Sequence, residues 1–177
     1  MLNFHKAELI DASAIAELIN SAYRGESSRA GWTTEANLLD GLRTTTQEVA
    51  GIIKRDDAFM LIGVLNDQVI ATICCERQVA HGRNTAHLGM IAVKPTLQNQ
   101  GHGATLIQAA EAIALREWRV AGFHMAVISI RSELIAFYER LGYAHTGEFK
   151  DFPVNSALWQ PKVTGLNLEY LAKVIKR

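Results

Sequence analysis

The segment from Ile91 to Ala104 constrains the fold most strongly, because a strand, a loop with two glycines and a long helix follow one another there. An apolar run ends at Val93, the loop contains Gly101 and Gly103, and a helical apolar pattern continues to about Trp118. This order turns several backbone N–H groups toward one point, which lies at the positive end of the helix dipole. Glycines let the backbone approach a bulky anion, so the segment predicts a pyrophosphate site, although two glycines also serve simply to shape a turn.

Two better-known phosphate loops do not fit this segment. A dinucleotide-binding fingerprint needs a third glycine three residues after Gly103, where this chain has Leu106, and it needs an acidic residue about 20 residues further on, which is absent. The Gly-Lys-Ser/Thr ending of a P-loop is absent as well. The segment therefore predicts a phosphate site of another kind.

The rest of the chain predicts an α+β fold, in which a mixed sheet carries helices on its faces. Residues 66–68 and 81–84 have the composition of turns, so the apolar runs beside them form a meander. The apolar run at 123–130 suits a strand covered on both faces. We expect strands at 2–7, 58–65, 69–79, 86–93, 123–130, 143–149 and 166–175, a loop at 25–32, and helices from Asp11 to about 23, from Thr33 or Thr34 through 42, from Thr45, at 100–118 and at 132–141.

Composition limits the classes of function and location. The 177 residues contain no linker-like tract, which fits a single domain over 1–177. Lys plus Arg equals Asp plus Glu at 18 each, so the positive charge of a nucleic-acid binder is missing. Cys74 and Cys75 are adjacent, which excludes a disulfide framework and favours reduced thiols. With no secretory signal and no stretch near the ~20 apolar residues that span a bilayer, we expect a soluble cytoplasmic protein with no membrane partner.

Two motifs together resemble those of the GNAT acyltransferase superfamily. Gln98-x-x-Gly101-x-Gly103 resembles the family's Gln/Arg-x-x-Gly-x-Gly/Ala signature, which binds the pyrophosphate of acetyl-CoA. Tyr138, followed four residues later by Gly142-Tyr143, resembles its second signature. The element order agrees over essentially the whole chain. The resemblance implies a mostly antiparallel twisted sheet with helices on both faces and a splayed pair of parallel strands.

The resemblance also implies how acetyl-CoA binds. Its pantetheine arm would lie between the splayed strands and bond to the backbone of Ile91 and Val93. The family often carries Gly and then Lys or Arg at the positions of Asn99 and Gln100, so backbone donors must supply more of the binding here, with Lys94 as a possible helper. Arg131 and Leu134 also depart from the residues common in the family. The loop residues expected to bind the cofactor are Gln98, Asn99, Gln100, Gly101, His102, Gly103 and Ala104.

Acetyl transfer to an amine requires that two protons be moved. A free alkylammonium has a pKa of about 10.4, so only about one molecule in a thousand is the neutral nucleophile near neutral pH. By resemblance, Tyr138 is the acid that protonates the departing thiolate. The strand before the loop offers His87 as a base, with Glu76 on the neighbouring strand as an alternative, and an amine that arrives neutral needs no dedicated base. No residue is assigned to a metal.

The acceptor site is expected under residues 25–40 and 150–161, by analogy with the family. Its pocket would suit an aromatic or carboxylate-bearing acceptor. The leading hypothesis is an N-acetyltransferase that moves an acetyl group from acetyl-CoA to a primary amine of a small molecule or peptide in a ternary complex, with homodimerisation possible. The alternative is a non-catalytic CoA-binding sensor. Candidate lining residues are Tyr23, Arg24, Arg29 and Trp32, while Phe149, Phe152 and Trp159 serve equally well as packing residues.

Overall fold

A seven-stranded sheet forms the centre of the protein in the computed structural model, which describes residues 2–80 and 82–175. Its order is β1-β3-β4-β5-β6-β9-β7, and all neighbours are antiparallel except β5 and β6. This arrangement confirms the mixed, mostly antiparallel sheet. The strands are β1 (Asn3–Lys6), β3 (Ala58–Leu65), β4 (Gln68–Ala80), β5 (Arg83–Val93), β6 (Gly122–Ile128), β7 (Ala144–Asp151) and β9 (Asn167–Val174).

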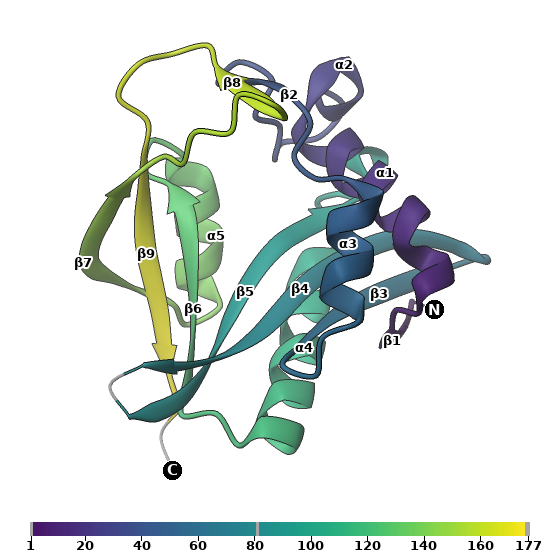
Figure 1. Ribbon diagram of the computed structural model, residues 1–177, viewed down its shortest axis with the longest axis vertical. Coiled ribbons are helices and arrows are strands. Elements are labelled where there is room, and N and C mark those ends of the chain that lie inside the picture. Colours follow the sequence, from purple (N-terminus) through teal and green to yellow (C-terminus); the bar gives the residue numbers. More distant parts are fainter. Residues whose placement is uncertain (1, 81, 176–177) are drawn as a thin grey trace.

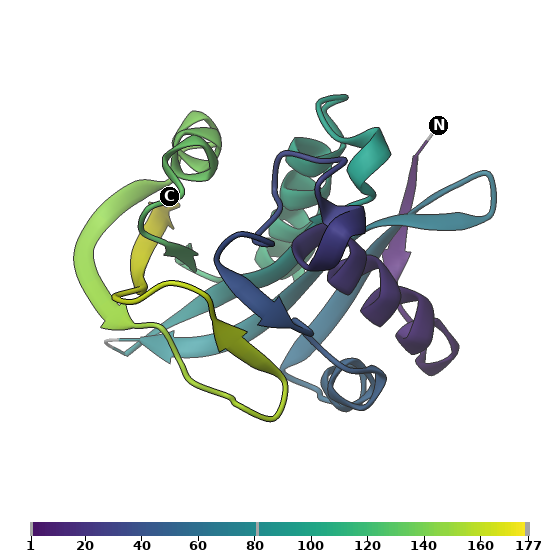
Figure 2. The same ribbon diagram turned by 90° about the horizontal axis from the view of Figure 1, so that it is seen from above.

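Helices cover both faces of the sheet, as expected (Figures 1 and 2). One hydrophobic cluster joins α4 (His102–Trp118) and α5 (Ser132–Arg140) to one face, and another joins α1 (Ala12–Tyr23) and α3 (Thr46–Ile53) to the opposite face. The short helices are η1 (Leu9–Asp11), α2 (Gly25–Ser28) and η2 (Pro95–Leu97). No helix among the described residues is long and apolar enough to cross a membrane.

The parallel strands β5 and β6 separate soon after they meet. Among the described residues they pair only at Ala86 with Phe123 and at His87 with His124. Figure 1 shows them diverging toward β2 (Leu39–Gly41) and β8 (Trp159–Pro161). A β-bulge lies at the point of separation: the register with β4 shifts there, and Met90 has a φ of 49°. Bulges bend a strand and increase its twist, so this one turns the end of β5 away from β6.

The predicted helix at 34–42 is wrong. Leu39–Gly41 forms strand β2, which pairs antiparallel with β8 (Trp159–Pro161) as a separate two-stranded sheet. Leu39 is buried there in a third hydrophobic cluster with Ile128 and Leu166. The partners of Leu39 in this cluster and in β8 lie in distant parts of the sequence, so local periodicity does not reveal them.

Other local expectations have mixed outcomes. The 66–68 turn is confirmed, with positive φ at Asn66 and Asp67, and Thr45 caps α3 by accepting a hydrogen bond from the Glu48 N–H at 3.1 Å. The predicted loop at 25–32 includes helix α2. Asp11 precedes α1, but its carboxylate accepts from the Glu8 N–H and closes η1 instead of capping α1.

Candidate active site

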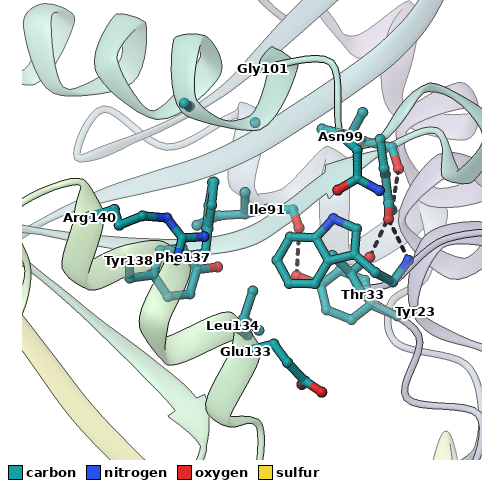
Figure 3. A pocket seen from close by; sticks show the side chains of 15 residues that line it. Tyr23, Thr33, Ile91, Asn99, Gly101, Glu133, Leu134, Phe137, Tyr138 and Arg140 are labelled. Carbon is teal, nitrogen blue, oxygen red and sulfur yellow. Dashed lines mark hydrogen bonds between the residues drawn. The ribbon is translucent and has the colours of Figure 1, made fainter.

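A cavity of about 250 Å³ lies between the end of β5, the start of α4 and helix α5. Figure 3 shows the start of α4 with Gly101 on one side, α5 with Phe137 and Tyr138 on a second, and the segment with Thr33 on a third. Most of the residues expected to bind the cofactor lie on its wall. They are Ile91, Val93, Gln98, Asn99, Gly101, Gly103 and Ala104.

The loop before α4 presents backbone donors to this cavity. Asn99 and Gly101 have positive φ, at 61° and 81°, and Gly101 is the N-cap residue of α4. Its carbonyl accepts the first helical bond, from the Thr105 N–H, and no side chain caps this end. The N–H groups of the first helical residues therefore keep no partner within the helix, and the positive end of its dipole faces the cavity.

Gly103 is a glycine that the packing of the protein does not require. A Cβ built there would lie 3.5 Å from the nearest atom of Phe137, an ordinary contact, and the backbone is helical. Glycine costs about 1 kcal/mol relative to alanine inside a helix. The missing side chain instead keeps this part of the cavity wall open, which suits the close approach of a bulky anion.

The edge of β5 supplies further donors. The N–H of Lys94 donates to the Ile70 carbonyl of β4 at 2.8 Å. Because backbone groups alternate between the two edges of a strand, those of Val93 and Ile91 point to the opposite edge, toward β6. The described pairing of β5 with β6 ends at His87, several residues before Ile91. The N–H groups of Ile91 and Val93 therefore face the cavity instead of another strand.

The Gln98 side chain joins the segment that contains Trp32 to the loop before α4 by hydrogen bonds. Its Oε1 accepts from the Trp32 N–H at 2.8 Å, and its Nε2 donates to Thr33 Oγ1 at 2.8 Å and to the Val93 carbonyl at 3.1 Å (Figure 3). A Cβ at Gly31 would lie 2.5 Å from this amide, so glycine leaves room for it. Gln98 therefore shapes the cavity with its side chain.

A second cavity, of about 330 Å³, shares part of its wall with the first. Tyr23, Ile91, Leu134 and Tyr138 line both. The Tyr23 hydroxyl donates to the Ile91 carbonyl at 2.6 Å, which fixes one side of the junction. Burial raises the pKa of Tyr138 well above its usual value, so the phenol stays protonated at neutral pH.

His87 lies in the second cavity, in the last pair that β5 makes with β6. Its ring centroid is 5.2 Å from that of His124, and its Nδ1 is 3.9 Å from Glu76 Oε1. Burial and the neighbouring His124 lower the pKa of His87, so its imidazole is neutral at pH 7 and able to accept a proton. Gly89 leaves room for this ring, since a Cβ there would lie 3.2 Å from its Cε1.

Several sequence candidates lie elsewhere. Gln100 and His102 do not line the first cavity, although their backbone belongs to the loop. Glu76 lines neither cavity and binds Arg55 at 2.5 Å. Arg29 also lies outside, paired with Glu26.

The aromatic candidates divide between the two cavities and the surface. Trp32 lines the first cavity and packs edge-to-face on Phe137, with ring centroids 5.8 Å apart. Phe152 and Trp159 line the second cavity with Arg24, whereas Phe149 is exposed. The sequence did not predict that Glu35, Arg43, Phe137 and Arg140 line these cavities, because none of them is a residue that defines either motif.

A sequence model of the acetyltransferase (GNAT) family matches residues 14–143, a range that contains the loop before α4, His87 and Tyr138. The chain belongs to the GNAT acetyltransferase family. Membership of this family favours a catalytic acetyltransferase over a CoA-binding sensor, and it confirms the resemblance of the two motifs.

Solved structures share the fold of this GNAT protein at low sequence identity. An acetyltransferase of the GNAT family from Streptococcus pneumoniae has a TM-score of 0.70 and 16% identity, covering 99% of this chain and 100% of that one. The ribosomal-protein-S18-alanine N-acetyltransferase from Escherichia coli has a TM-score of 0.68 and 17% identity, covering 100% and 96%. The NatC complex bound to Gag peptide and CoA has a TM-score of 0.71 and 14% identity, covering 99% of both chains.

The role of Gln98 in shaping the cavity gives a testable prediction. Gln98→Ala removes three hydrogen bonds and lowers the free energy of unfolding by about 2 kcal/mol, at about 0.5–1.5 kcal/mol for each bond. Urea denaturation measures the change. Gln100→Ala, at an exposed position of the same loop, is the control and leaves stability unchanged. Equal stability of the two variants would show that the Gln98 amide does not hold this loop.

Proposed function

We propose that this protein transfers the acetyl group of acetyl-CoA to a primary amine in a ternary complex. The observation that carries the proposal is the convergence of two sets of backbone donors, from the start of α4 and from the open edge of β5, on a cavity that ends at Tyr138. A diphosphate fits the first set and an extended amide-containing arm fits the second. Cytoplasmic location and homodimerisation stay predictions from the sequence.

The first cavity has the charge and shape to bind coenzyme A. The free N–H groups of Gly103 and Ala104 and the positive dipole of α4 attract the diphosphate. Two charged side chains of α5 also line the cavity, Arg140 at the end of the helix with a positive charge and Glu133 at its start with a negative one. The N–H groups of Ile91 and Val93 bind the pantetheine arm.

Replacement of Ala104 by glutamate tests the diphosphate site. A carboxylate in the first turn is favourable for the helix, but it repels a diphosphate bound there. Ala104→Glu therefore keeps the free energy of unfolding and weakens CoA binding at least about tenfold, as measured by calorimetry. Gln108→Glu adds the same charge one turn further along the helix, at an exposed position that does not line the cavity, and keeps the affinity. Equal affinities of the two variants would contradict the assignment.

Acetyl transfer then depends on three groups of the chain. Acetyl-CoA supplies an acetyl group activated as a thioester. A backbone N–H of the open β5 edge polarises the thioester oxygen, in the way that oxyanion donors act. His87 accepts one proton of the incoming ammonium, and the resulting amine attacks the thioester carbon to form a tetrahedral adduct. As the adduct collapses, the C–S bond breaks, Tyr138 protonates the departing thiolate, and the second proton lost by the nitrogen restores the Tyr138 hydroxyl. The side chains of His87 and Tyr138 both line the second cavity.

The pH dependence of the reaction tests His87 as the base. Because the pKa of His87 is lowered, the neutral imidazole persists below pH 6.5 and kcat/KM falls only when the solution is more acidic than that pKa. His87→Gln removes this acidic limb and lowers kcat/KM by about 100-fold. His124→Gln removes a positive neighbour, so the pKa of His87 rises and the limb moves to higher pH. An unchanged limb in His87→Gln would exclude this base.

The Tyr138 hydroxyl is tested by removing it alone. Tyr138→Phe lowers kcat by about 100-fold and keeps the affinity for CoA, because the ring remains and only the proton donor is lost. Tyr143→Phe is the matched control: its ring lies 6.2 Å from that of Tyr138, but its hydroxyl binds Glu111, so stability falls and kcat does not. Full kcat in Tyr138→Phe would favour a thiolate that leaves without an acid.

A further inference from the structure

Charged side chains are unequally distributed on the second cavity. Arg24, Arg43 and Arg131 line it with a single carboxylate, that of Glu35. Arg24 and Arg131 are 4% and 7% exposed. Arg24 Nη2 lies 3.1 Å from Glu35 Oε2, whereas Arg131 Nη1 lies 4.0 Å from Glu35 Oε1, which is beyond hydrogen-bond distance. One carboxylate thus faces three guanidinium groups.

Two buried donors on this wall have no hydrogen-bond partner. The Nη1 atoms of Arg24 and Arg131 make no bond with any residue in the part of the chain that the structure describes. A buried donor without a partner costs about 1–3 kcal/mol, and more when the group is charged, so native proteins rarely keep one. Arg24 and Arg131 also line the cavity, and their positive charge favours a ligand with an acidic group there.

The phosphates of coenzyme A do not fit this role. Their predicted site is the start of α4, where Gly101 and Gly103 line the first cavity, and Arg24 and Arg131 line only the second. The second cavity lies on the other side of Tyr138, where the acceptor amine is expected. The acidic group therefore belongs to the acceptor.

Resting on the proposed function, we infer that the acceptor is an amino acid with an apolar side chain, whose carboxylate binds Arg24 and Arg131. Guanidinium groups bind carboxylates through paired N–H donors, which fixes the orientation of the ligand as well as its charge. Met125, Phe152 and Trp159 line the same cavity and suit an apolar body. The excess positive charge disfavours acceptors that carry only ammonium groups, such as polyamines.

Matched amines test the carboxylate. CoA release is measured with L-leucine and L-phenylalanine, with their amides, and with spermidine. The amide has the lower amine pKa, about 8 as in a peptide, and so has more of the neutral nucleophile, which biases the comparison against our inference. We expect kcat/KM to be at least about tenfold higher for the carboxylates than for the amides, and lowest for spermidine. Amides that equal or exceed the carboxylates would overturn the inference.

Variants assign the preference to the arginines. Arg131→Gln raises KM for the carboxylates, leaves the amides unchanged and so removes the preference. Arg24→Gln with Glu35→Gln removes the Arg24 guanidinium together with the carboxylate that pairs with it, leaves Arg131 charged, and reduces the preference. Arg29→Gln, on the exposed side of the same region, is the control and keeps the preference. A preference that survives undiminished in the first two variants would place the carboxylate elsewhere and overturn the inference.

The failure of the proposed function is a separate outcome. If no amine releases CoA while CoA itself binds, the catalytic proposal fails, and the anion site is then measured directly. Calorimetry with N-acetyl-L-leucine and N-acetyl-L-leucinamide in the presence of CoA decides it. Tighter binding of the acid, lost in Arg131→Gln, supports the inference, and equal binding overturns it.

Discussion

The separation of β5 from β6 is the constraint on which the rest of this structure depends. Two residue pairs hold the strands together, and the bulge at Met90 then turns β5 away. The backbone of Ile91 and Val93 therefore faces a cavity. In a closed sheet it would face another strand. An unpaired strand edge is normally a liability, and in the proposed function it becomes the surface that binds the cofactor.

The same separation places two different environments on either side of Tyr138. Toward α4 the wall consists of backbone donors and glycine, which suits a phosphate-bearing arm. Toward β8 it consists of buried arginines, His87 and aromatic rings, which suits a small acidic amine. Tyr138 lines both cavities, so in the proposed function both substrates reach one proton donor.

The sequence predicted the parts of this site that are encoded locally. The spacing of Gln98, Gly101 and Gly103 predicted a binding site at the loop before α4, and these residues line the first cavity, as does Tyr138 of the second local motif. The pairing of β2 with β8 was not predictable in this way, because Leu39 is buried only by residues distant in sequence. Arg24 was a candidate residue of the acceptor pocket, but its grouping with Glu35 and Arg131 was not predictable, since the three residues come from separate segments.

Hydrogen exchange at the open edge of β5 tests this account most directly. The backbone amides of Ile91 and Val93 are followed by NMR with and without CoA, and those of β4 residues serve as an internal reference. We predict fast exchange in the free protein and strong protection in the complex, together with the amides of Gly103 and Ala104. Equal exchange with and without CoA, at CoA concentrations that saturate the protein, would contradict the account, because the ligand would then bind elsewhere.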